Sequence, residues 1–153
     1  MKIIYLFLVV IILTSSCAYK KMNSADKKKI HIQNIEITGD KRTSFIIKKK
    51  INRFSNAEGE NKINIFIELE KERKIQEKDI RNKVTKYKLS INANLKVSDI
   101  ESRKELNRTF NSNQTYIVDS NYSNTVNNLK EANNLLIETI VNEILDQLRI
   151  YYN

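Results

Sequence analysis

The stretch Val-Thr-Lys-Tyr-Lys-Leu-Ser-Ile-Asn-Ala-Asn-Leu-Lys-Val, residues 84–97, alternates between apolar and polar side chains. The apolar positions are Tyr87, Leu89, Ile91, Ala93, Leu95 and Val97, and the polar positions between them are Lys86, Lys88, Ser90, Asn92, Asn94 and Lys96. A period of two places each set on its own face of a β-strand, whereas a helix would spread both sets around its whole circumference. The pattern therefore predicts a strand with one face in water and one face that needs a cover.

The segment Val126–Tyr152 is the only one long and apolar enough to provide that cover. Its apolar residues recur at helical spacing and comprise Val126, Leu129, Leu136, Ile137, Ile140, Val141, Ile144, Leu145 and Leu148. Residues three and four apart share one face of a helix, so the segment predicts a long amphipathic helix that begins near 120–123. We expect its apolar stripe to pack on the sheet.

Upstream of the alternating stretch, a strand, a short helix and a second strand are expected. Ile30, Ile32, Ile35 and Ile37 indicate the first strand, and its phase slips at 33–34, which predicts a β-bulge. Ile47, Ile51 and Phe54 predict a helix over 43–54, with Thr43 or Ser44 as its N-cap. Ile63, Ile65, Ile67 and Leu69 indicate the second strand, with Phe66 on its other face.

Two polar segments flank the alternating strand. Residues 71–83 are highly charged and lose the alternation, which predicts a wide, mobile hairpin tip. Residues 99–104 predict a turn, and a fourth strand follows with Leu106, Phe110, Tyr116 and Val118 in one register, interrupted at 111–114. The predicted fold class is α+β, a two-layer sandwich. Its four-stranded, mainly antiparallel sheet is covered on one face by two helices, in the order β-α-β-β-β-α.

The amino terminus has the pattern of an export signal. Lys2 is followed by an unbroken apolar run over 3–13, and small residues at 14–16 precede Cys17. An eleven-residue helix would span only about 16 Å, roughly half of a bilayer's hydrocarbon core. Residues 1–16 therefore predict a cleaved signal peptide, residues 17–29 a polar, lysine-rich tether, and residues 30–153 one folded domain.

Cys17 is the only cysteine of the chain and directly follows the predicted signal. The arrangement resembles a bacterial lipobox, in which cleavage before the cysteine is coupled to acylation of its thiol, with Thr14 where a bulky aliphatic residue is usual. A lone cysteine in an exported chain has no disulfide partner but can carry a lipid. The alternative is an ordinary secretory signal that ends beside an unused thiol. With acyl chains such as palmitate on Cys17, the protein would be held on a membrane.

Composition limits the functional classes. The chain has 153 residues, enough for one domain, and a net charge of +9 that is spread along its length. Dispersed basic charge indicates either a solvated surface or an anionic partner such as phosphorylated lipid. Nucleic acid is not expected, because the export signal removes the protein from the cytoplasm.

Residues that carry catalytic chemistry are scarce. His31 is the only histidine, so no metal site or nucleophilic triad can be assembled from this sequence. Glu68 and Glu70 share one face of a strand, which favours a solvated edge over an acid/base pair, and Gly39 and Gly59 are too far apart for a phosphate-binding loop. We therefore expect a protein that is not an enzyme and has no cofactor and no metal.

The order of these elements resembles that of the lipopolysaccharide-assembly lipoproteins, the LptE family of Gram-negative bacteria. The resemblance is carried by Cys17-Ala18-Tyr19, the strand end at 35–40, Thr85-Lys86-Tyr87-Lys88-Leu89 and the amide-rich helix over 122–148. It implies an outer-membrane lipoprotein, anchored on the periplasmic side, that plugs and helps assemble the lipopolysaccharide-export β-barrel (an LptD-like partner). It also implies binding of lipopolysaccharide.

Lipopolysaccharide is phosphorylated and therefore requires cations. The candidate residues for this contact are Lys71, Arg73, Lys74, Lys78, Arg81 and Lys83, all within the predicted hairpin tip. A polar face with Lys86, Lys88, Asn92, Asn94 and Lys96 suits a water-filled barrel. The alternative is a free-standing, lipid-anchored periplasmic module that binds acidic lipid or polymer.

Overall fold

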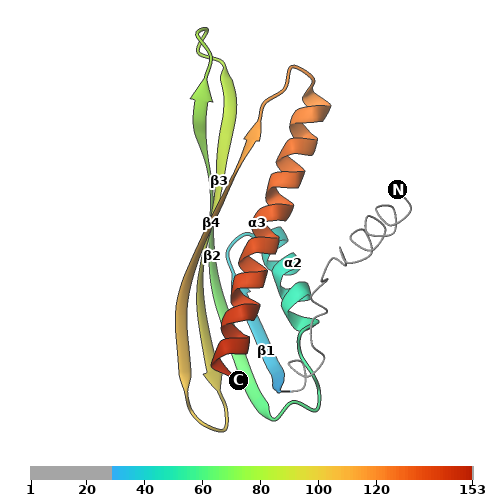
Figure 1. Ribbon diagram of the computed structural model, residues 1–153, viewed down its shortest axis with the longest axis vertical. Helices are drawn as coiled ribbons and strands as arrows, with labels where there is room; N and C mark the ends of the chain where they lie inside the picture. The colour runs from blue at the N-terminus through green and yellow to red at the C-terminus, as the bar shows by residue number, and fades with distance from the viewer. Residues whose placement is uncertain (1–28, 153) are drawn as a thin grey trace, which may run out of the picture.

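The structure is a computed structural model and describes residues 29–152. The elements are β1 (Ile30–Thr38), α2 (Lys41–Asn52), β2 (Asn61–Lys78), β3 (Val84–Asp99), β4 (Glu105–Ile117) and α3 (Tyr122–Tyr151) (Figure 1). The predicted signal peptide, Cys17 and nearly all of the predicted tether lie outside the described residues.

The four strands form one sheet in the order β1-β2-β3-β4. β1 runs parallel to β2, and the other two pairs are antiparallel. A parallel pair requires a crossover connection, and α2 provides it. Both helices lie on the same side of the sheet, α2 against β1 and α3 against β4 and β3 (Figure 1). The predicted two-layer α+β architecture and element order are confirmed.

β3 is a central strand with neighbours on both sides, as its alternation predicts. Leu89, Ile91, Ala93, Leu95 and Val97 are all buried on the face toward the helices. The apolar stripe of α3 covers them with Leu136, Ile137, Ile140, Val141, Ile144 and Leu148, which are also buried. At about 1.5 Å per residue, the 30 residues of α3 reach about 45 Å.

The N-terminal strand and helix follow the prediction except at the helix cap. The register of β1 shifts between Ile32 and Asn34, so the predicted bulge is confirmed. The N-cap of α2 is Asp40, and the prediction of Thr43 or Ser44 is wrong. The Asp40 carboxylate accepts hydrogen bonds from the Thr43 amide at 2.9 Å and from the Thr43 hydroxyl. Aspartate is a strong N-cap, so α2 begins two residues earlier than predicted.

The predicted mobile hairpin tip over 71–83 is mostly strand. β2 continues to Lys78 and pairs with β3 as far as Val84, so the connecting turn spans only residues 79–83. β1 ends at Thr38, opposite Glu68, and from there on β2 is an edge strand whose side chains are exposed over 70–78. The strand continues beyond Leu69, but its side chains are no longer buried there. The sequence therefore loses its alternation of apolar and polar residues although the backbone remains a strand.

Gly39 marks the place where β1 leaves the sheet. Its φ is +112°, and a Cβ atom there would lie 2.2 Å from the Leu69 carbonyl oxygen. Only glycine permits both this backbone conformation and this close approach. β1 therefore stops here, and the edge of the sheet passes to β2.

β4 is continuous over Glu105–Ile117, so the predicted interruption at 111–114 is wrong, and Val118 lies beyond the strand. Leu106, Phe110 and Tyr116 share the helix-facing side as predicted, and the buried Ser112 continues their register. Asn111 and Asn113 face the other side of the sheet, where the Asn111 side chain donates to the Asn92 side chain. Gln114 lies opposite the buried Leu89, so the polar residues of this segment alternate between the two faces and the strand continues through them.

Candidate functional site

The six predicted lipopolysaccharide contacts do not form one cluster. Lys71, Arg73 and Lys74 lie within β2, Lys78 ends it, and Arg81 and Lys83 lie in the turn. At about 3.3 Å per strand residue, Lys71 and Lys78 are about 23 Å apart along β2. Lys71 and Arg73 project toward the helix layer, and Lys74 projects to the opposite face. The cations therefore divide into a turn group (Lys78, Arg81 and Lys83), a pair on the helix side (Lys71 and Arg73), and Lys74 alone on the opposite face.

The turn group is built on Asp79. Its carboxylate accepts from the Arg81 amide at 2.9 Å and from the Lys83 amide at 2.8 Å, and its own amide donates to the Lys83 carbonyl at 2.8 Å. Asn82 adopts a φ of 62°, and its side chain accepts from Lys78 Nζ at 2.9 Å. The hydrogen bonds give a defined turn in place of a wide loop. It presents Ile80 fully exposed among the cations Lys78, Arg81 and Lys83.

Two of the six cations have partners that fix them within the sheet. The Arg73 guanidinium lies 4.8 Å from the centre of the Tyr87 ring, which stacks on Tyr116 with a centroid distance of 5.5 Å. Lys74 pairs with Glu72 at 2.9 Å on the outer face. Arg73 and Lys74 are thus already engaged by neighbouring side chains, whereas Lys71, Arg81 and Lys83 form no ion pair within residues 29–152.

A groove separates the first turn of α2 from the N-terminal half of α3. It has a volume of about 290 Å³ and is lined by Arg42, Thr43, Ile46, Lys71, Val126, Leu129, Lys130, Asn133, Asn134 and Ile137. An adjoining hollow shares Lys71, Leu129 and Asn133 and adds Asp40, Glu72, Arg73 and Leu89. We call the first cavity the α2–α3 groove. Its floor is apolar and its rim carries cations from three different elements.

The Asp40 carboxylate lies beside this groove. Its hydrogen bonds to the Thr43 side chain and backbone hold the pKa of Asp40 below its ordinary value, and the charges of Lys71 and Arg42 lower it further. Asp40 is therefore ionised at neutral pH and offsets part of the positive charge at the rim.

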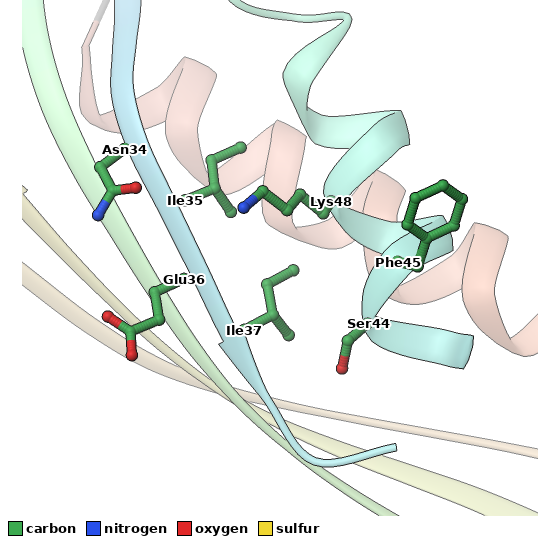
Figure 2. Close-up of a pocket in the computed structure, with 7 residues that line it drawn as sticks. All are labelled: Asn34, Ile35, Glu36, Ile37, Ser44, Phe45 and Lys48. Carbon is green, nitrogen blue, oxygen red and sulfur yellow. The ribbon is translucent and has the colours of Figure 1, made fainter. Parts of the chain in front are cut away.

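A shallow hollow lies at the other side of α2, along the free edge of the sheet. Figure 2 shows Ile35 and Ile37 pointing from β1 toward α2, from which Ser44, Phe45 and Lys48 project, while Asn34 and Glu36 point away. The Ser44 hydroxyl is buried without a hydrogen-bond partner, and the Phe45 ring is exposed. Its only charged groups, Glu36 and Lys48, lie on opposite sides of β1 and do not converge.

The residues considered for catalysis have structural roles. His31 Nδ1 donates to the Asn56 carbonyl at 3.1 Å and ties β1 to the loop after α2. Glu68 accepts from Asn94 at 3.5 Å on the helix-free face, where Glu70 lies opposite Asn92. Among residues 29–152, no three His, Cys, Asp or Glu side chains are grouped to hold a metal ion.

Sequence reasoning missed Arg42, Lys130 and Asn133 as site residues. Arg42 precedes the predicted helix over 43–54, Lys130 was assigned to the solvent face of the C-terminal helix, and Asn133 was not assigned to either face. The available signal was Lys130 beside Leu129, at the place where the stripe of α3 passes the start of α2. The crossing of the two helices, which brings Arg42 and Lys130 together, was not visible in either segment alone.

Comparisons with known proteins identify the fold. No protein-family model and no curated protein sequence matches the chain. The uncharacterized lipoprotein B from Nitrosomonas europaea superposes with a TM-score of 0.58 at 14% identity, covering 81% of this chain and 86% of its own. The minor lipoprotein from Acinetobacter baumannii superposes with a TM-score of 0.56 at 11% identity, covering 82% of this chain and 94% of its own. The rare lipoprotein B from Shewanella oneidensis superposes with a TM-score of 0.52 at 12% identity, covering 75% of this chain and 92% of its own.

The chain therefore shares its fold with solved bacterial lipoproteins over most of their length. Neither α2 nor α3, the helices of the described part of the chain, is long and apolar enough to cross a bilayer.

Proposed function

We propose that this protein is an outer-membrane lipoprotein, anchored at Cys17, that plugs and helps assemble the lipopolysaccharide-export β-barrel and binds lipopolysaccharide. The proposal joins the lipobox-like leader and the LptE-family resemblance of the sequence to a fold shared with bacterial lipoproteins. The protein needs no catalytic group for this role, and we propose that it is not an enzyme.

The observation that carries the plug role is the helix-free face of the sheet. Several of its polar side chains bond one another: Thr109 donates to Asn94 at 2.9 Å, Asn111 to Asn92, and Lys86 pairs with Glu77 at 2.7 Å. Such a face is stable in water without a covering layer and can lie against the polar wall of a wide barrel.

Co-purification tests this role. Full-length protein with a C-terminal tag would be recovered from detergent-solubilised outer membranes, and the proteins retained with it identified by mass spectrometry. The proposal requires recovery of a large β-barrel protein in comparable amount. Recovery of the lipoprotein alone, from membranes in which it is acylated and correctly localised, would contradict the plug role.

The turn group is the proposed lipopolysaccharide contact. Replacing Lys78, Arg81 and Lys83 with Ala is expected to weaken lipopolysaccharide binding about tenfold or more, since each cation can make a charge-assisted hydrogen bond to phosphate. The matched control replaces Lys48, Lys49 and Lys104, which are also exposed and carry the same total charge. Equal binding by both triple variants would mean that the turn is only surface.

A second candidate function is that of a free-standing, lipid-anchored module that binds acidic lipid or polymer. The α2–α3 groove favours it, because a groove with an apolar floor and a cationic rim can bind such a ligand without a barrel partner. This function predicts that Cys17→Ser yields a stable soluble monomer whose affinity for acidic lipid falls steeply with salt. Dependence of that variant's solubility on a barrel partner would favour the first function instead.

A further inference from the structure

The floor of the α2–α3 groove is apolar surface that the fold leaves uncovered. Val126 is 41% exposed, Leu129 and Ile46 are half-buried, and Ile137 closes the bottom. These side chains come from two helices that meet at an angle, so they form a concave strip in place of scattered surface residues. A concave apolar strip gains free energy when a hydrocarbon chain displaces water from it.

The rim of the groove is positively charged. Arg42, Lys71 and Lys130 approach from α2, β2 and α3, and within residues 29–152 none of the three forms an ion pair. The carboxylates nearby are Asp40, which caps α2, and Glu72, which pairs with Lys74. Cations therefore outnumber acids around the opening, and the rim can accept a phosphate group.

Asn133 adds a third requirement for the ligand. Its Nδ2 donates to the Leu129 carbonyl at 2.9 Å, but its Oδ1 is buried without a hydrogen-bond partner. A buried acceptor without a donor is unfavourable, so a ligand that supplies an N–H or O–H group gains free energy by pairing with it. Phosphate oxygens and ester groups cannot donate, whereas an amide N–H or a hydroxyl can.

From these three features we infer that the α2–α3 groove binds a phosphorylated glycolipid through one acyl chain whose linkage donates a hydrogen bond, as an amide does. The chain lies on Val126, Leu129 and Ile46, its linkage donates to Asn133 Oδ1, and the phosphate contacts Arg42, Lys71 and Lys130. The volume of about 290 Å³ is at the lower end for a small-molecule site, which suits one chain and its linkage. This site rests on the proposed function and lies apart from the turn group.

Site-specific photo-crosslinking tests the inference in the full-length protein. The photoreactive residue p-benzoylphenylalanine would replace Val126 in the groove, Ile80 in the turn, or Leu135. Leu135 is the matched control: it lies on the same helix and is 45% exposed, but it lines a hollow on the β4 side together with Glu131 and Lys86. After irradiation of Gram-negative cells, lipopolysaccharide attached to the protein is detected by immunoblot against its core oligosaccharide.

Crosslinks at Val126 but not at Leu135 are expected. Lys71→Ala combined with Lys130→Ala should reduce the Val126 yield about tenfold, because charge-assisted contacts to phosphate are lost. Crosslinks at Ile80 without any at Val126 would refute the α2–α3 groove as a lipid-binding site but would leave the proposed function intact. Absence of lipopolysaccharide crosslinks at both positions would count against the proposed function itself.

A vesicle experiment tests the chemistry of the occupant. The Val126 variant is reconstituted into phosphatidylcholine vesicles that contain either lipid A, with phosphates and amide-linked chains, or phosphatidic acid, with one phosphate on a glycerol whose other two oxygens carry ester-linked chains. The inference requires preferential crosslinking to lipid A, and Asn133→Leu should diminish that preference. Equal crosslinking to both lipids, or a preference that survives Asn133→Leu, would overturn the assignment of a linkage that donates a hydrogen bond.

Discussion

The two halves of β2 differ in what stabilises them, although they form one continuous strand. From Ile63 to Leu69 the strand lies between β1 and β3, and every second side chain is buried under the helices. From Glu70 to Lys78 it has a neighbour on one side only, and all of its side chains are exposed. The first half is held by the core and the second by the ladder to β3 and by cross-strand contacts.

The residues of β2 that stabilise the fold are therefore separate from those that we propose bind a ligand. The first half contributes the apolar area that drives folding. The second half contributes Lys71 to the groove and Lys78 to the turn group, and it is positioned by Arg73 on Tyr87 and by the Glu77–Lys86 pair. Side chains in the second half can therefore change with little cost to the fold, which is the usual condition for a binding surface on a rigid scaffold.

The largest difference in free energy of unfolding is expected between alanine variants of two isoleucines in β2. Ile67 is fully buried, and Ile67→Ala should destabilise the protein by about 2–5 kcal/mol through the cavity it leaves. Ile75 is 52% exposed, and Ile75→Ala should cost less than about 1 kcal/mol. Urea unfolding followed by circular dichroism measures both. Similar losses would mean that the second half of β2 is also held by a core.

The boundary between the halves depends on Gly39. Gly39→Ala places a Cβ atom against the Leu69 carbonyl and forces alanine into an unfavourable φ, so a loss of about 1–3 kcal/mol or more is expected. Urea unfolding measures it. Gly59→Ala, where a Cβ would contact the Ile30 backbone without a positive φ, separates the steric effect from the conformational one. An unchanged urea midpoint for Gly39→Ala would contradict the close approach of Gly39 to the Leu69 carbonyl group.

Asp40, the N-cap of α2 on the helix-covered face of the sheet, should make the stability of the protein depend on pH. Asp40→Ala removes the N-cap of α2 and should cost about 1 kcal/mol near neutral pH. Because the folded-state pKa of Asp40 is lowered, its contribution is present above the unfolded pKa of roughly 3.9 and is lost as pH falls through the folded pKa. The stabilities of wild type and variant should therefore converge in acid. A constant difference at every pH would show that ionised Asp40 does not stabilise α2.

The smallest change in global stability is expected at the turn. Asp79→Ala removes the carboxylate that accepts from the Arg81 and Lys83 amides, at a cost of about 1 kcal/mol or less for an exposed turn. Faster amide hydrogen exchange should be confined to the turn and the adjoining ends of β2 and β3. Asp79→Asn retains an acceptor and serves as the control. Protection unchanged in Asp79→Ala would contradict an Asp79-centred turn.

Most of the fold was predictable because it follows from two periodicities. The alternation in β3 and the helical stripe of α3 are long and unbroken, so each identifies its element and its buried face. β1, its bulge and α2 are shorter but use the same signals. The predictions failed where burial ends before the strand does, in the second half of β2, and where a polar residue, Ser112, occupies a buried position.

The candidate site was less predictable. The charge of residues 71–83 was evident, but only the strand register shows which cations face the helices and which face away. Arg42 and Lys130 are 88 positions apart and become neighbours because α2 crosses α3. No local pattern reports such a crossing, and the unsatisfied oxygen of Asn133 is a property of packing rather than of sequence.

The edge of β2 over 70–78 has no neighbouring strand, and an unpaired strand edge is a template for sheet formation between copies. This matters more for a protein held on a membrane, as proposed above, because its copies meet one another more often than molecules in free solution. Lysine, arginine and glutamate side chains line this edge over 70–78, and charged side chains on an edge strand hinder its pairing with a second copy. The charges of this edge thus help to keep neighbouring copies apart.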